Sequence, residues 1–274
     1  MKNIYTWAAH PATRNLTVAD MQAQKGQKQW VEVTANTEDE AAAAEAAGVD
    51  LLICHAASVE EVRAGSKNLF LTASLVLQAF VTEEDILRGA FEALTKGADA
   101  VMTPRSMKVV KMLASEDVPV RGHLGLVPRK STWVGGLRAI GKSAGEAYSL
   151  YRKFKDLEEA GAVMVESEVI PGPVMTEITR RTSLITVSLG SGDGADVNFL
   201  FMSDICGEQP DAPRHAKAYA NLHELYEKIK SERVRALTEF CADARSGRFP
   251  GHTESVSIDE REMEGFLNLL EKEG

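Results

Sequence analysis

Short apolar runs recur along the chain, and each follows a glycine at the end of a stretch with helical character. Gly48, Gly97 and Gly161 each precede such a run, with one or two residues between. Glycine readily adopts the left-handed conformation that ends a helix. Three junctions of this kind predict buried parallel strands that alternate with helices.

Hydroxyl side chains mark where several of these helices begin. Thr37, Ser58, Thr82 and Ser143 are each followed, three residues later, by Asp or Glu. A hydroxyl and a carboxylate at this spacing bind the first free backbone N–H groups of a helix. After Thr82, apolar residues recur at helical period as far as residue 94. The pattern therefore predicts an amphipathic helix there.

The apolar runs number eight, which fits a single (β/α)8 TIM barrel of 274 residues. A doubly wound sheet is less favoured, because no glycine-rich phosphate fingerprint follows the first strand. We expect one domain, 1–274, with an N-terminal helix segment at 1–29 that starts near Thr17 and a C-terminal helical tail at 251–274. The expected strands are 31–35, 51–54, 69–73, 100–103, 118–122, 162–166, 184–189 and 198–202.

Composition narrows the class of protein. The chain has 40 Asp and Glu against 31 Lys and Arg, a net charge of −9, which disfavours nucleic acid or an anionic membrane surface as a partner. Three cysteines without paired spacing indicate a reducing compartment and no zinc site. We find no signal-peptide pattern and no membrane-spanning apolar run. We therefore expect a cytoplasmic protein with no membrane partner.

Two polar residues follow apolar runs directly. His123 lies between Gly122 and Gly125 after the run that begins at Val118, and Glu168 precedes Pro171 after another such run. In a strand–helix repeat, the carboxyl ends of the strands form the mouth at which active sites are built. We expect His123 and Glu168 to be catalytic there, with Glu168 as a general acid or base. The alternatives are a structural histidine and a solvated loop carboxylate.

The order and spacing of several motifs resemble the ketopantoate hydroxymethyltransferase family. The similarity implies a (β/α)8 barrel of the phosphoenolpyruvate mutase and isocitrate lyase type, a homo-oligomer built from rings, and carbon–carbon bond chemistry on a small 2-oxo acid. The segments that carry the resemblance are 16–26, 122–128, 135–141, 168–171, 177–179, 190–192, 203–207 and 246–250.

The same resemblance implies Mg²⁺ held by two Asp and one Glu, and a one-carbon unit from methylenetetrahydrofolate. In this chain those three ligand positions carry Ala56, Ser74 and Pro104, and Met102 stands where the family has a lysine near the substrate. Mg²⁺ requires hard oxygen ligands in near-octahedral geometry. We therefore expect no metal and no bound cofactor, while tetrahydrofolate stays open as a donor.

Loss of the metal would remove a source of positive charge, so another group is needed to bind an acid. His55, Ser74 and Arg105 are the substrate-binding candidates, since each stands at or beside a lost ligand. His55 or Arg105 would supply the charge. The alternatives are a histidine packed beside Cys54 and an arginine that begins a solvated helix.

The sequence leaves three alternative functions open. The first is an enzyme of the family's kind, acting on a small 2-oxo acid or related carboxylate. The second is a metal-independent lyase or hydrolase that reuses Glu168. The third is a barrel that binds a small acid without catalysis. A fold alone does not separate them, because function lies in the site.

Overall fold

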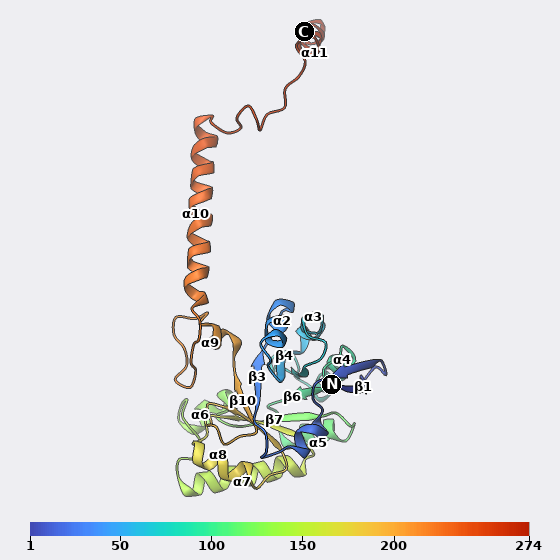
Figure 1. Ribbon diagram of the computed structural model, residues 1–274, viewed down its shortest axis with the longest axis vertical. Helices are drawn as coiled ribbons and strands as arrows, with labels where there is room; N and C mark the ends of the chain where they lie inside the picture. The colour runs from blue at the N-terminus through green and yellow to red at the C-terminus, as the bar shows by residue number, and fades with distance from the viewer. Residues whose placement is uncertain (274) are drawn as a thin grey trace. The chain divides into compact units, whose positions relative to one another are not determined.

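Eight parallel strands form a closed barrel in the computed structural model, which describes residues 1–273 (Figure 1). Each strand overlaps one of the expected apolar runs, which confirms the (β/α)8 fold. Around the barrel the strands follow the order β10-β3-β4-β5-β6-β7-β8-β9. Their bounds are β3 (Trp30–Thr34), β4 (Leu51–His55), β5 (Phe70–Ser74), β6 (Ala100–Met102), β7 (Val120–Gly125), β8 (Met164–Glu168), β9 (Ile185–Leu189) and β10 (Val197–Leu200).

Helices connect most of these strands, and several start as predicted. Thr37 and Thr82 accept a hydrogen bond from the backbone three residues on, in full capping boxes, and Ser143 does so at α7. Ser58 precedes α3 but makes no side-chain cap, since the 3₁₀ turn η1 runs directly into that helix. The helices are α2 (Glu38–Ala46), α3 (Val59–Gly65), α4 (Glu83–Thr95), α5 (Met107–Ala114), α6 (Ser131–Val134), α7 (Ala144–Glu159), α8 (Gly172–Thr179) and α9 (Met202–Cys206), with 3₁₀ turns η1 (Ala56–Ser58) and η2 (Pro128–Lys130).

The connection from β9 to β10 contains no helix, unlike the regular alternation that we expected. Asp196 stabilises this short turn: its Oδ2 accepts hydrogen bonds from the backbone N–H and the hydroxyl of Thr186 and pairs with Lys25 at 2.5 Å. The last strand also ends earlier than predicted. Phe201 caps α9 instead of extending β10.

Alternation along the strands divides the apolar residues between two cores. Side chains such as Trp30, Leu51 and Phe70 pack inside the barrel. Their neighbours, such as Leu52 and Leu71, pack between the strands and the surrounding helices. The barrel interior is therefore filled by side chains, as in other TIM barrels.

The N-terminal segment begins with a hairpin that we did not predict. β1 (Lys2–Tyr5) and β2 (Pro11–Arg14) pair antiparallel, and only Arg14 among these strand residues is buried. With so few buried positions, the segment has no strand-like apolar alternation. α1 (Val18–Ala23) follows, capped by Thr17 as predicted, and its Met21 joins the core inside the barrel.

The chain divides into two compact units, residues 1–219 and 220–274. The second contains α10 (Leu222–Ser246) and α11 (Glu260–Glu273). α11 lies within the predicted C-terminal tail, whereas α10 was not predicted. That the whole chain acts as one domain stays a prediction. Through residue 273, no helix has both the length and the apolarity to cross a membrane.

Candidate active site at the barrel mouth

A cavity of about 310 Å³ lies at the carboxyl ends of the strands. Its walls come from β3, β4, β5, β6, β8 and β10 and from the residues that follow them. His55 and Ser74, two of the predicted substrate-binding residues, line it, as does Glu166. The backbone N–H of His55 donates to Asn36 Oδ1 at 2.8 Å, which fixes the end of β4. This is the face at which TIM-barrel enzymes hold their substrates.

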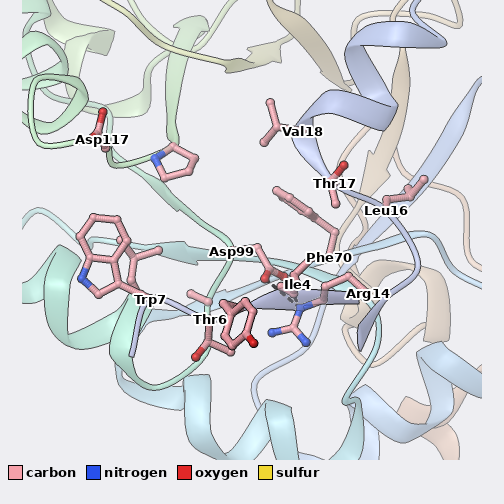
Figure 2. Close-up of a pocket in the computed structure, with 14 residues that line it drawn as sticks. Ile4, Thr6, Trp7, Arg14, Leu16, Thr17, Val18, Phe70, Asp99 and Asp117 are labelled. Carbon is pink, nitrogen blue, oxygen red and sulfur yellow. Dashed lines mark hydrogen bonds and ion pairs between the residues drawn. The ribbon is translucent and has the colours of Figure 1, made fainter. Parts of the chain in front are cut away.

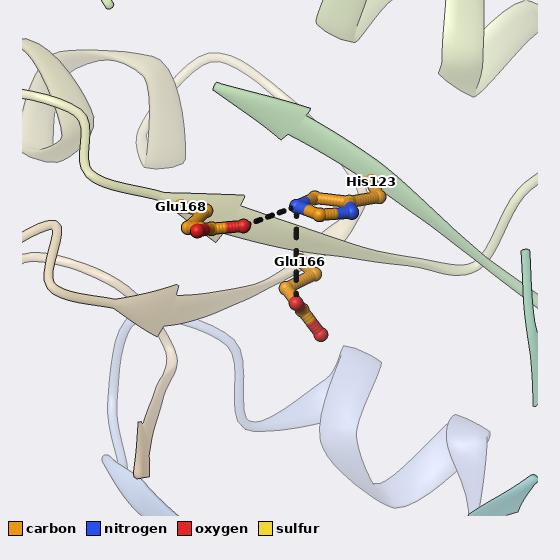
Figure 3. A group of neighbouring side chains, drawn as sticks. All are labelled: His123, Glu166 and Glu168. Carbon is orange, nitrogen blue, oxygen red and sulfur yellow. Dashed lines mark hydrogen bonds and ion pairs between the residues drawn. The ribbon is translucent and has the colours of Figure 1, made fainter. Parts of the chain in front are cut away.

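His123 and Glu168, the two predicted catalytic residues, contact each other. Nε2 of His123 lies 2.8 Å from Oε2 of Glu168, a hydrogen bond from imidazole to carboxylate (Figure 3). The register of β7 and β8 pairs His123 with Glu166 and Gly125 with Glu168, so all three polar side chains face inward. The side chains of His123 and Glu168 are only 7% and 13% exposed. The structure therefore brings together two residues that are 45 positions apart.

The backbone at Gly125 explains why a glycine stands beside this pair. Its φ is +89°, and a Cβ atom there would lie 2.2 Å from the carbonyl oxygen of Glu168. The next residue, Leu126, donates its N–H to that same carbonyl at 2.7 Å. Glycine thus allows the two strand ends to approach closely, and this approach fixes Glu168 against His123.

Sequence reasoning missed a buried ion network below this pair. Nη1 of Arg121 donates to both carboxylate oxygens of Glu32, at 2.8 and 2.7 Å, and Nη2 donates to Oε2 of Glu166 at 2.7 Å. Arg121 and Glu32 have no exposed side-chain surface. Arg121 and His123 are two positions apart on β7, as Glu166 and Glu168 are on β8. Because alternate residues of a strand share a face, this spacing indicates that Arg121 and Glu166 lie on the same inner face as the predicted pair.

Burial and pairing oppose each other in this network. Burial raises the pKa of Glu32, and Arg121 acts to lower it. Burial acts to lower the pKa of Arg121, yet the neighbouring carboxylates, Glu32 foremost, raise that pKa above its ordinary value. The guanidinium therefore stays charged and holds both glutamates in place. Removing either partner would leave a buried charge without compensation.

Cys54 lies on the cavity wall beside His55. Burial raises the pKa of its thiol to about 12. A thiol with so high a pKa is neutral at physiological pH, and a neutral thiol is a poor nucleophile. Cys54 therefore packs the wall instead of attacking a substrate.

Arg105, the third predicted substrate-binding residue, is not among the residues that line the cavity. Its guanidinium donates to the backbone carbonyls of Phe80 and Val81, in the loop between β5 and α4. These contacts use the side chain to hold the loop. The geometry thus favours His55 over Arg105 as the residue that faces a ligand.

The three positions to which the family resemblance assigns Mg²⁺ ligands carry residues that do not suit this ion. Ala56 begins η1, Ser74 ends β5, and Pro104 follows β6. The hydroxyl of Ser74 lies 3.7 Å from the sulfur of Met102 and is the one side-chain oxygen at these positions. Since Mg²⁺ prefers several carboxylate and water oxygens, these residues do not fit the ion.

A second cavity, of about 290 Å³, lies at the opposite end of the barrel, beneath the β1–β2 hairpin (Figure 2). Arg14 lines it and pairs with Asp99 at 2.8 Å, and Asp99 also pairs with Arg63 at 2.6 Å. The amino ends of the strands in a TIM barrel serve stability. We interpret this charged group as the closure of the barrel bottom.

Comparison with known proteins identifies the family. A sequence profile described as ketopantoate hydroxymethyltransferase matches residues 53–252. This chain belongs to that family. Two similar relatives are both named 3-methyl-2-oxobutanoate hydroxymethyltransferase. The protein from Thermotoga maritima is 30% identical over 91% of this chain and 99% of its own length. The protein from Methylibium petroleiphilum, numbered 1 in its name, is 29% identical over 82% and 75%.

Solved structures support the fold independently. Phosphoenolpyruvate phosphomutase from Streptomyces platensis matches 94% of this chain and 98% of its own, with a TM-score of 0.51 and 12% identity. A 2,3-dimethylmalate lyase, a member of the phosphoenolpyruvate mutase and isocitrate lyase superfamily, matches 84% and 89%, with a TM-score of 0.52 and 9% identity. At such low identity the likeness concerns the barrel fold alone.

Proposed function

We propose that this member of the ketopantoate hydroxymethyltransferase family is an enzyme that acts on a small 2-oxo acid through enolate-type carbon–carbon bond chemistry. The observation that carries the proposal is the hydrogen bond between His123 and Glu168 at the barrel mouth. Glu168 accepts the proton from the carbon beside the keto group, and His123 orients the carboxylate that accepts it. A positioned acid–base group of this kind contributes roughly 10²–10⁴-fold to a rate.

We assign substrate binding to residues of the cavity wall. His55 can donate to a carboxylate as imidazole or imidazolium, and Ser74 can donate through its hydroxyl. Arg105 remains a weaker candidate, since its guanidinium already donates to backbone carbonyls. The cavity of about 310 Å³ suits a small metabolite and not a long chain.

The proposed reaction uses no Mg²⁺ at the positions of Ala56, Ser74 and Pro104. A metal that polarises a carbonyl is worth several kcal/mol, and a loss of about 4 kcal/mol costs roughly a thousandfold in rate. We therefore expect slow turnover compared with a metal-dependent relative. Methylenetetrahydrofolate is retained as one of two donors to test, beside free formaldehyde.

The test is turnover of 3-methyl-2-oxobutanoate with either donor, in the presence of EDTA or of Mg²⁺. We expect product with a rate that Mg²⁺ leaves unchanged. Turnover that requires Mg²⁺ would contradict our interpretation of the three substituted positions. Absence of turnover with both donors would contradict the proposed reaction.

A second function is favoured by the substituted metal positions themselves. A metal-independent lyase or hydrolase could reuse Glu168 and His123 on another small carboxylate. Cleavage of a 2-hydroxy or 2-oxo acid that is lost in Glu168→Gln would support it. Tight binding of such an acid without any turnover would instead support a non-catalytic binding barrel.

We further propose a cytoplasmic homo-oligomer. The three described cysteines are free, which suits a reducing compartment. Large apolar side chains on α10 are about half exposed within that unit, among them Tyr226, Ile229 and Phe240. An apolar helix face of this kind usually packs against a partner.

A further inference from the structure

We propose that His123, Glu166 and Glu168 form a binding site for one divalent transition-metal ion. Each offers one donor atom, and the three atoms lie within 4.8 Å of one another. His123 Nε2 is 2.8 Å from Glu168 Oε2 and 3.8 Å from Glu166 Oε1. Metal bonds of about 2.1 Å place neighbouring donors roughly 3.0 to 3.4 Å apart. Small side-chain movements would therefore accommodate an ion.

One carboxylate oxygen points independently to a ligand. Oε2 of Glu166 accepts from Arg121, but Oε1 accepts no hydrogen bond from any residue in 1–273, although the side chain is only 8% exposed. In Figure 3 this oxygen is directed at the ring nitrogen of His123. Glu166 also lines the cavity, so this oxygen is available to a metal ion that enters there.

The local charge also favours a cation. Three glutamates, Glu32, Glu166 and Glu168, share this region with one guanidinium, that of Arg121, so carboxylates outnumber cationic side chains there. Nη1 of Arg121 donates to both carboxylate oxygens of Glu32, and Nη2 donates to one oxygen of Glu166, so the other oxygen of Glu166 receives no hydrogen bond from Arg121. A bound dication would pair with the carboxylates that Arg121 does not hold.

The donor types select the class of ion. One imidazole nitrogen with two carboxylate oxygens suits Mn²⁺, Fe²⁺, Co²⁺ or Zn²⁺, whereas Mg²⁺ and Ca²⁺ prefer oxygen alone. The site lies on β7 and β8, while the family's ligand positions follow β4, β5 and β6. It is therefore a different site from the one that the family resemblance implies.

One consequence rests on the proposed function. An ion that binds Nε2 of His123 and an oxygen of Glu168 replaces the hydrogen bond between them. Glu168 then ligates the metal instead of accepting a proton. Metal binding and proton transfer by Glu168 should therefore exclude each other, whereas metal binding itself does not depend on the reaction.

The test is the binding of Mn²⁺ alone to metal-stripped protein, measured by electron paramagnetic resonance. We expect one ion per chain, with affinity lowered at least tenfold in Glu168→Gln and in His123→Asn. Glu92→Gln, an exposed carboxylate on α4, is the matched control and should bind as the wild type does. Pulsed electron paramagnetic resonance should detect a nitrogen ligand to Mn²⁺ in the wild type, and this nitrogen signal should be lost in His123→Asn. Thermal unfolding of each variant checks that it is folded.

Absence of stoichiometric Mn²⁺ binding by the wild type would overturn the proposal, as would equal binding by both site variants. A second assay separates this inference from the proposed function. If Mn²⁺ binds as described and slows a Glu168-dependent reaction, both stand. If Mn²⁺ binds and the metal-free protein catalyses nothing, the metal site stands and the proposed function fails.

Discussion

Single residues at the barrel mouth differ in how they act. We propose that Glu168 and His123 move a proton, whereas Arg121 holds Glu166 and Glu32 in place below them. Among these five residues, Glu166 is the one that also lines the cavity. Gly125 adds no functional group, yet it decides where Glu168 stands because no side chain separates the two strand ends.

Gly125→Ala should therefore damage both stability and the site. Alanine at a φ of +89° is strained, and its Cβ would meet the carbonyl oxygen of Glu168. We expect a loss of about 2 kcal/mol or more in the free energy of unfolding, measured by urea denaturation. Gly145→Ala in α7 is the control: nothing lies within 4 Å of the added atom, and we expect a gain of about 0.5–1 kcal/mol. Equal effects of the two substitutions would contradict this explanation.

At the scale of elements, side-chain hydrogen bonds join helices to the strands that follow. Glu158 near the end of α7 accepts from the hydroxyls of Thr182 and Ser183 at 3.0 and 2.6 Å, just before β9. Burial acts to raise the pKa of Glu158, but bonds from Lys155 and Ser183 outweigh it and lower the pKa to about 2. The carboxylate thus anchors the loop between α8 and β9.

Glu158→Gln should destabilise the protein by about 1–2 kcal/mol at neutral pH. Because the folded pKa is lowered, the stabilisation is complete above the unfolded value of 4.5 and is lost as the pH falls toward about 2. The difference in unfolding free energy between variant and wild type should therefore stay nearly constant from pH 7 to about 5 and shrink as the pH falls from 4.5 toward 2. Glu159→Gln, an exposed neighbour, should show no such trend. A difference that stays constant with pH would contradict the assignment.

The elements were predictable to different degrees. Each barrel strand stands out as a short apolar run, and caps such as Thr82 are local signals. The β1–β2 hairpin lacks a buried alternating face and was missed. His123 and Glu168 could be singled out as candidates because they follow such runs, and the structure shows that they touch. The Arg121–Glu32 pair, in contrast, joins residues 89 positions apart. Partners that distant meet only after the barrel closes, so local pattern does not reveal them.

At the scale of the whole molecule, the chain combines the barrel of its family with a separate C-terminal unit, residues 220–274. The C-terminal unit carries apolar side chains on α10 that stay about half exposed within it. We expect these side chains to be covered in solution by other copies of the chain. This expectation agrees with the oligomer that the family resemblance implies.

Light scattering after gel filtration should therefore give a multiple of the chain mass of 29.8 kDa. Ile229→Glu should lower that mass, because it places a charge on the apolar face of α10. Lys230→Glu is the control on the charged face and should leave the assembly intact. The mass of a single chain for the wild type would contradict an oligomer, and an unchanged mass for Ile229→Glu would exclude α10 from the interface.

We propose that Glu168 takes a proton from the carbon beside the keto group of a 2-oxo acid. The most direct test of this proposal is exchange of the C3 proton of 3-methyl-2-oxobutanoate in D₂O, followed by proton NMR without any one-carbon donor. We predict exchange by the wild type and by Glu92→Gln, and a rate at least about 100-fold lower in Glu168→Gln. Exchange by Glu168→Gln at the wild-type rate, or by the wild type no faster than in buffer, would contradict it.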